Sequence, residues 1–214
     1  MIVAIDGPAG SGKGTVTSLI AEKLNLTCID TGATYRALAL YTIKNNISLE
    51  DRQKIIDASK HVDIKMIGDR VYLDNIDVTK EIRSTEVTSI VSQVSSIKEV
   101  RENMVYIQRK MAEGLDVIME GRDITTVVFP DADYKFYLDA SLEERAKRRF
   151  LQNQSLKVSS SMEEIIDNIK FRDYNDMNKE VGSLMRTNDQ IYIDSTNLSI
   201  DEVVNLIVAK IRGE

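Results

Sequence analysis

The sequence contains one cysteine, one histidine and no tryptophan among its 214 residues. A single cysteine, Cys28, cannot form an internal disulfide or a cysteine-based zinc site. A single histidine, His61, excludes a Ser-His-Asp triad and any metal centre that needs several histidines. Chemistry that depends on such groups is therefore excluded.

Long apolar runs and an excess of positive charge are also missing. No stretch of about 18 apolar residues could span a membrane, and no basic leader precedes the apolar run that starts at Ile2. We therefore expect a cytoplasmic protein without a membrane partner. The formal net charge of −6 argues against a nucleic-acid polymer as partner, because such polymers usually meet a basic surface. A single nucleotide needs only a local cluster of cations.

Five short strand-like runs alternate with helical patterns along the chain. They cover residues 2–5, 27–30, 116–119, 134–138 and 190–194, and most are nearly continuous apolar runs. Such runs are typical of strands covered on both faces. The alternation predicts an α/β fold with three layers, in which helices cover a five-stranded parallel sheet.

One segment breaks the alternation. Apolar residues recur at every second position on both sides of the Gly68-Asp69 pair, which is typical of a β-hairpin. We therefore expect a small β-rich insert over about residues 61–83.

The most informative stretch is IVAIDGPAGSGKGT, residues 2–15. Gly7, Gly12 and Lys13 have the P-loop spacing G-x-x-x-x-G-K, between an apolar strand and an amphipathic helix. Glycines let successive backbone N–H groups converge on phosphate oxygens, and the helix N-terminus favours negative charge. We therefore predict that this loop binds the phosphates of a nucleoside triphosphate, through Gly7, Pro8, Ala9, Gly10, Ser11, Gly12, Lys13, Gly14 and Thr15.

The hydroxyl that usually follows the P-loop lysine is displaced by one position. Gly14 follows Lys13, and the hydroxyl comes at Thr15. Thr15 and Asp30 are the candidate ligands of a Mg²⁺ ion.

Two further strand ends carry arginines. Thr31 and Arg36 follow the second strand, and Arg122 and Asp123 follow Gly121 at the end of the third. Because ligands of open α/β sheets bind at the carboxyl ends of the strands, these residues are candidates for a second, anionic ligand. A surface arginine at position 36 and a plain ion pair at 122–123 are the alternatives.

Two later helical segments add charged pairs at a spacing of four. Arg145 and Arg149 would share one helix face and would repel unless an anion, Glu143 or Glu144 compensated them. Arg172 and Asp176 also share a face. Between these segments, the polar residues 152–161 predict a mobile loop.

Together these stretches resemble the bacterial cytidylate kinase family, within the nucleoside monophosphate kinases. The resemblance runs nearly end to end, through IDGPAGSGKGT, DTGATYRALAL, EIRSTEVTSIVSQVSSIKEVR, GRDITTVVFPDAD, YLDASLEERAKRR, RDYNDMN and IDST. It implies phosphoryl transfer from ATP, with Mg²⁺, to CMP and dCMP. A kinase of UMP, AMP or shikimate, or a P-loop module that is not a kinase, is the alternative.

The resemblance also implies roles for individual residues. Lys13, Arg122 and Arg149 would be catalytic, and Arg145 and Arg149 would join the P-loop residues in binding ATP. Arg36 and Arg122 would hold the acceptor phosphate, and Ser92, Arg101 and Asp123 would bind the cytosine. Arg172 and Asp176 would bind the sugar. The remaining substrate contacts would be Thr31 and Lys179.

Three positions depart from the family pattern. Lys179 stands where the family usually has a phosphate-clamping arginine, so the charge is kept but the bidentate fork is lost. Thr125 replaces a usual glycine, and Ser183 replaces a usual proline. We expect a monomer with one P-loop kinase domain, divided into a core (about 1–60, 84–150 and 177–214), an acceptor-binding insert (61–83) and a mobile lid (151–176).

Overall fold

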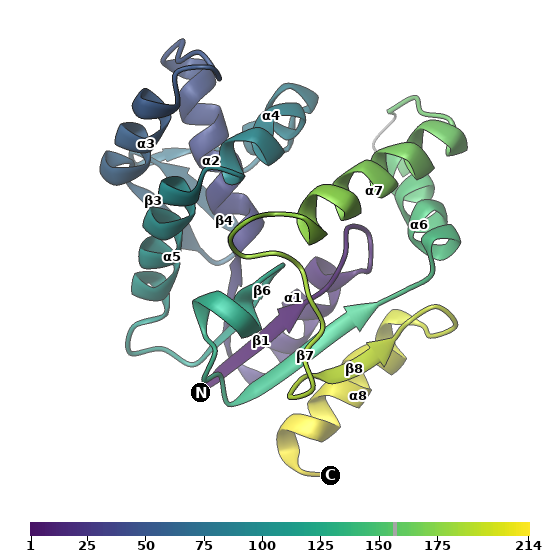
Figure 1. Cartoon of the computed structure of the whole chain (residues 1–214). Helices are drawn as coiled ribbons and strands as arrows, with labels where there is room; N and C mark the ends of the chain where they lie inside the picture. The colour runs from purple at the N-terminus through teal and green to yellow at the C-terminus, as the bar shows by residue number, and fades with distance from the viewer. Residues whose placement is uncertain (156–157) are drawn as a thin grey trace.

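The computed structural model describes residues 1–155 and 158–214. A five-stranded parallel sheet lies at the centre, in the order β2-β6-β1-β7-β8 (Figure 1). Its strands are β1 (Ile2–Asp6), β2 (Thr27–Asp30), β6 (Val117–Gly121), β7 (Tyr134–Asp139) and β8 (Ile191–Asp194). The predicted α/β class and the five parallel strands are confirmed.

Two apolar layers bury the faces of this sheet. On one face, β-strand side chains such as Ile5, Phe136 and Leu138 pack with residues of α1 (Lys13–Leu24) and α8 (Ile200–Arg212). On the other, Ala4 and Met119 pack with residues of α5 (Lys98–Ala112) and the π-helix η2 (Ile124–Val128). Burial on both faces explains why the inner strands β1, β6 and β7 are nearly continuous apolar runs in the sequence.

A second group of elements packs beyond β2. It contains α2 (Thr31–Lys44), α3 (Arg52–His61), η1 (Glu81–Arg83) and α4 (Thr85–Ser95), which share one apolar core with part of α5. An antiparallel sheet of β3 (Ile64–Ile67), β4 (Arg70–Leu73) and β5 (Ile76–Asp77) belongs to the same group.

This small sheet has one strand more than the predicted hairpin. Asp74 and Asn75 both have positive φ, 50° and 64°, which suits the tight turn that brings β5 back onto β4. Because β5 has only two residues, its sequence carries no periodic pattern that could predict it.

On the opposite side of the molecule, α6 (Leu142–Ser155) and α7 (Met162–Met177) pack together (Figure 1). The expectation of a loop from residue 152 is wrong at its start, because α6 continues to Ser155. Ser161 and Glu164 form the capping box that begins α7. Leu156 and Lys157, inside the expected mobile loop, lie outside the described residues. No helix within the described ranges is long and apolar enough to cross a membrane.

Candidate active site

The P-loop connects β1 to α1 and needs glycine at its bends. Gly10 and Gly12 have φ of 80° and 94°, values that side-chain-bearing residues rarely adopt. The Lys13 side chain is buried and folds back over the loop, where Nζ donates to the carbonyl oxygens of Gly7 at 2.8 Å and Pro8 at 2.9 Å. Burial, together with the like charge of Arg122, lowers the pKa of Lys13 to about 7.

Side chains from α6 and α7 hold the P-loop from outside. Arg145 Nη1 donates to the Ala9 carbonyl at 3.0 Å and to Asp173 Oδ2 at 2.6 Å, and Asp173 Oδ1 accepts from the Ala9 amide at 3.3 Å. Arg148 Nη1 donates to the Ser11 carbonyl at 3.2 Å. Two helices that follow β7 are thereby tied to the loop that precedes α1.

The two arginines predicted on one face of α6 have different surroundings. Arg145 is buried against the P-loop, whereas Arg149 is exposed and donates to Gln152 at 2.9 Å. Glu144 does not compensate Arg145, because it accepts from Arg148 at 3.0 Å. Arg145 is instead neutralised by Asp173 of α7.

Glu120, at the end of β6, lies beside the P-loop and was not among the predicted residues. A Cβ on Gly14 would lie 2.9 Å from Glu120 Oε1, so glycine is what allows this carboxylate to sit against α1. Burial and the like charge of Asp30 raise the pKa of Glu120. Thr15 is exposed nearby on α1, and Asp30 caps α2 by accepting from the Ala33 amide at 3.0 Å.

Basic side chains from three segments are each bonded to a carboxylate. Arg36 of α2 donates to Asp30 at 2.6 Å, and Arg122, after β6, donates from Nε to Asp176 Oδ2 at 2.7 Å. Lys179 donates to the other oxygen of Asp176 at 2.8 Å. Burial acts to raise the pKa of Asp176, but Arg122 and Lys179 outweigh it and hold that pKa below its usual range.

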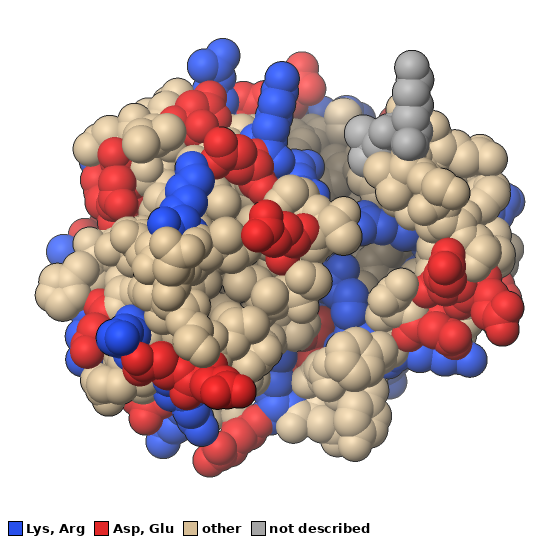
Figure 2. All heavy atoms as spheres, turned by 90° about the horizontal axis from the view of Figure 1, so that it is seen from above, with Lys and Arg blue, Asp and Glu red and all other residues tan. Residues whose placement is uncertain are grey.

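Arg172 of α7 faces the same space. Arg172 is an exposed residue, and partial desolvation by the surrounding protein, with the like charge of Arg122, lowers its pKa to about 10. The charges of Arg149 and Arg36 act in the same direction, so these side chains share one electrostatic environment. Figure 2 shows Lys and Arg atoms gathered in a hollow that opens on this side of the molecule. Such a concentration of cations suits an anionic ligand.

A buried ion pair lies deeper in the same region. Arg101 of α5 and Asp123, which follows β6, are only 3% and 5% exposed and are joined through Arg101 Nη2 and Asp123 Oδ2. The Arg101 guanidinium also lies 5.4 Å from the centre of the Tyr35 ring and donates to the Ser95 carbonyl at 3.2 Å. Ser92, predicted to share this site, is a half-buried residue of the neighbouring helix α4.

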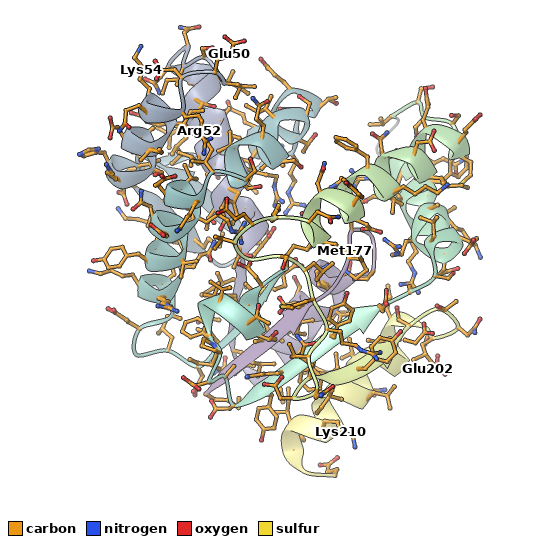
Figure 3. All side chains as sticks on the ribbon, viewed as in Figure 1. Glu50, Arg52, Lys54, Met177, Glu202 and Lys210 are labelled. Carbon is orange, nitrogen blue, oxygen red and sulfur yellow. The ribbon has the colours of Figure 1, made fainter. Side chains whose placement is uncertain are left out.

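The chain that follows α7 covers this pair. Gly182 has φ of 67°, and a Cβ on it would overlap Asp123 Oδ2 and Arg101 Nη2. The segment begins beyond Met177, which lies between the two helical groups in Figure 3. Glu50, Arg52 and Lys54 lie far from it, at the outer end of the group that contains α3. Glycine is therefore required at position 182 because the backbone passes close to the Arg101–Asp123 pair. The neighbouring residues in the sequence do not reveal this contact.

Other predicted residues have structural partners. Thr31 is buried, and its hydroxyl donates to the Glu120 carbonyl at 2.7 Å, which links the ends of β2 and β6. Sequence reasoning missed four polar residues at the site, Asp6, Glu120, Arg148 and Asp173. Asp6 and Glu120 stand at strand ends directly beside predicted site residues, which is a usable signal. Arg148 and Asp173 lie on helices, where no local signal in the sequence distinguishes them from ordinary surface charges.

A glycine-rich loop that connects the carboxyl end of the central strand β1 to α1 in a parallel sheet defines a P-loop nucleotide-binding fold. Two solved structures support this class by likeness of fold alone. An uncharacterized protein from Eubacterium ventriosum aligns with a TM-score of 0.56 and 12% identity over 100% of this chain and 99% of its own. Shikimate kinase from Bacteroides thetaiotaomicron aligns with a TM-score of 0.51 and 11% identity, over 99% and 98%.

Sequence comparison identifies the family. The family model described as Cytidylate kinase matches residues 3–213, and the chain belongs to this family. It is 46% identical to the cytidylate kinase of Fusobacterium nucleatum over 99% of this chain and 97% of that protein. It is 48% identical to the cytidylate kinase of Caldanaerobacter subterraneus, over 98% and 94%.

Proposed function

We propose that the protein transfers the γ-phosphoryl group of ATP to CMP and dCMP, giving ADP and the corresponding diphosphate. Membership of the cytidylate kinase family supports this activity. The observation that carries it in the structure is the buried pair Arg101–Asp123, together with the neighbouring Arg122 and further arginines close enough to Arg122 and Arg172 to share one electrostatic environment. A protein that bound only one nucleotide would have no use for this second set of charges.

The arginine cluster would hold the acceptor phosphate. Arg36 and Arg122 supply planar donor sets that match phosphate oxygens in pairs. Arg36 is bonded to Asp30. Arg122 is bonded to Asp176 and, through Nη1, to the Gly121 carbonyl at 3.3 Å. The N–H groups outside these bonds are available to a phosphate. Lys179 adds a third cation, held against Asp176.

The buried pair would bind the cytosine with help from Ser92. A carboxylate accepts from the exocyclic amino group, and a guanidinium donates to the ring nitrogen and carbonyl. Uracil has a carbonyl where cytosine has that amino group, so Asp123 would meet an acceptor and disfavour UMP. Arg172 and Asp176, on the last turns of α7, would bind the sugar hydroxyls.

Catalysis would be positioning and neutralisation of charge. The attacking group is a phosphate oxygen that is already anionic at neutral pH, so no general base is needed. Lys13 would approach the β- and γ-phosphates of ATP, and Arg122 would face the transferring group. Arg145 and Arg149 of α6 would add donor-side charge, of which Arg145 is already fixed at the P-loop by Asp173.

The groups beside the P-loop fit a Mg²⁺ ion. Mg²⁺ takes oxygen ligands and is usually held by one or two carboxylates together with substrate phosphates. Glu120 lies beside Gly14, Thr15 follows Gly14 in the chain, and Asp30 is close enough to Glu120 to raise its pKa, so the three supply such oxygens. A bound ion would neutralise phosphate charge, while Lys13 and the arginines orient the two nucleotides.

The proposal also gives roles to the lid and to the insert. The lid at about residues 151–176 would close over ATP and exclude water, and the insert at about 61–83 would help to form the acceptor site. A monomer in the cytoplasm, with no nucleic-acid polymer as partner, is the corresponding expectation for the whole chain.

The test is an ADP-release assay with ATP and a panel of acceptors, CMP, dCMP, UMP, AMP and shikimate. We expect the highest kcat/KM with CMP or dCMP and a much lower value with UMP. A kcat/KM for AMP or shikimate above that for CMP would contradict the proposal. ATP hydrolysis that no acceptor stimulates would point to a P-loop module without an acceptor.

A further inference from the structure

The side chain of Thr125 lies in a buried hydrogen-bond network outside the groups that would touch either nucleotide. Its hydroxyl donates to Asp6 Oδ2 at 2.5 Å, and its backbone amide donates to the same oxygen at 2.9 Å. The amide of Ile124 donates to Asp6 Oδ1 at 2.8 Å. Asp6 is fully buried, so these donors satisfy a carboxylate that water cannot reach.

The same hydroxyl accepts a bond from a distant residue. Gln190 Nε2 donates to Thr125 Oγ1 at 2.5 Å, and Gln190 Oε1 accepts from the Thr187 amide at 2.8 Å. The backbone N–H of Thr187 needs an acceptor, so it must face the side-chain oxygen of Gln190. The side-chain nitrogen of Gln190 therefore faces Thr125. Thr125 therefore donates to one partner and accepts from the other, as a hydroxyl can.

These bonds join three parts of the site. Asp6 directly precedes the P-loop, and Thr125 is the second residue after Asp123. Gln190 ends the segment that passes over Asp123 at Gly182 and enters β8. The network thus fixes the loop that carries Arg122 and Asp123 to the donor side of the site and to the covering segment.

We propose that Thr125 is a positioning residue for binding of the acceptor base. Its hydroxyl holds the 121–125 loop between Asp6 and Gln190, so that the Asp123 carboxylate keeps its place. This inference rests on the proposed phosphorylation of CMP. Thr125 touches neither nucleotide. It acts through Asp123, whose carbonyl in turn accepts from the amides of Val127 and Val128 at 2.8 and 3.1 Å.

The effect should appear in acceptor binding more than in turnover. Arg122 has its own anchor in Asp176, on α7, which does not depend on Thr125. Among the described residues, Arg101 is the one hydrogen-bond partner of the Asp123 carboxylate, so a looser loop displaces this carboxylate first. Removal of an interaction that stabilises the ground state and the transition state equally raises KM and leaves kcat unchanged.

Thr125→Val is the main variant, because valine keeps the shape and removes the hydroxyl. It leaves Gln190 Nε2 buried without a partner, and we expect the KM for CMP to rise about tenfold. We also expect a smaller ratio of kcat/KM for CMP to that for UMP, whereas kcat and the KM for ATP stay within about twofold. Thr125→Ser, which restores the hydroxyl, should recover the wild-type values.

Thr126→Val is the matched control. Thr126 is the next residue, and its buried Oγ1 has no hydrogen-bond partner among the described residues. The same change of atoms should therefore leave the KM for CMP unaltered. Equal effects of the Val variants at positions 125 and 126, or an unchanged KM and acceptor ratio in Thr125→Val, would overturn the proposal.

Gln190→Met tests the same network should Thr125→Val fail to fold. It removes the bonds that Gln190 makes with Thr125 and Thr187 but leaves the bond from Thr125 to Asp6, so we expect a smaller rise in the KM for CMP. The double variant should be no worse than Thr125→Val alone, because both changes break one network. Additive effects would contradict it. A wild-type protein without CMP kinase activity would refute the proposed function instead, before any variant is made.

Discussion

Arg122 Nε donates to Asp176 Oδ2 at 2.7 Å, although the two residues are 54 positions apart in the chain. The bond connects the loop after β6 to the last turns of α7. It therefore joins the central sheet to the helix that also holds the P-loop through Asp173. Asp176 and Asp173 thus give one helix a contact on each side of the proposed site.

Replacement of Asp123 by asparagine should weaken CMP binding and relax selectivity. The amide keeps the shape but would lose the proposed charge-assisted bond to cytosine, so we expect kcat/KM for CMP to fall about 30-fold. Activity with UMP should fall less, because the amide also carries donors. The measurement is steady-state kinetics with both acceptors. Asp131→Asn, at an exposed position, is the control, and CMP kinetics unaffected by Asp123→Asn would reject the assignment.

ATP binding should take up a proton at pH 8. The free protein has a Lys13 pKa of about 7, so most Lys13 side chains are neutral at that pH. Adjacent phosphate charge favours the protonated form and raises the pKa, so a proton is bound with the nucleotide. Isothermal titration calorimetry in two buffers that differ in ionisation enthalpy measures this uptake.

Lys13→Met is the control for that experiment. It should show no uptake, and its kcat should fall at least 100-fold because charge stabilisation at the transferring phosphate is lost. Equal proton uptake by the wild type and this variant would show that another group titrates.

Asp173→Asn should raise the KM for ATP about tenfold and leave the KM for CMP nearly unchanged. The substitution removes a charged partner from Arg145 and loosens the hold on the Ala9 amide, so the P-loop is less well ordered. Asp167→Asn, at an exposed position of the same helix, should be neutral. A rise in the KM for CMP of the same size would argue for a general loss of structure.

Gly182→Ala should destabilise the fold more than Gly114→Ala does. Both glycines have positive φ, 67° and 73°, so both substitutions introduce the same backbone strain. Only at Gly182 would the new Cβ overlap Asp123 and Arg101, whereas Gly114 has nothing within 4 Å. We expect an additional loss of about 1–3 kcal/mol in the free energy of unfolding, measured by urea denaturation. Equal losses would mean that the covering segment moves freely away from the pair.

The amount that could be predicted differs between the donor and the acceptor sides. The P-loop is contiguous in the chain, so the spacing of Gly7, Gly12 and Lys13 predicts it, together with the strand and the helix that flank it. Arg148 was missed as a P-loop contact, although it is adjacent in sequence to the predicted Arg149. Successive residues on a helix point about 100° apart, and nothing local specifies which face of α6 meets the loop.

The sequence by itself determined the sheet, the phosphate loop and the resemblance to one kinase family, because each depends on local spacing and on short motifs. Only the tertiary structure decided that Asp173 neutralises Arg145, that Gly182 covers Arg101 and Asp123, and that Thr125 joins Asp6 to Gln190. These contacts link residues that are far apart along the chain. Their energy depends on burial and distance, which no periodicity in the sequence records.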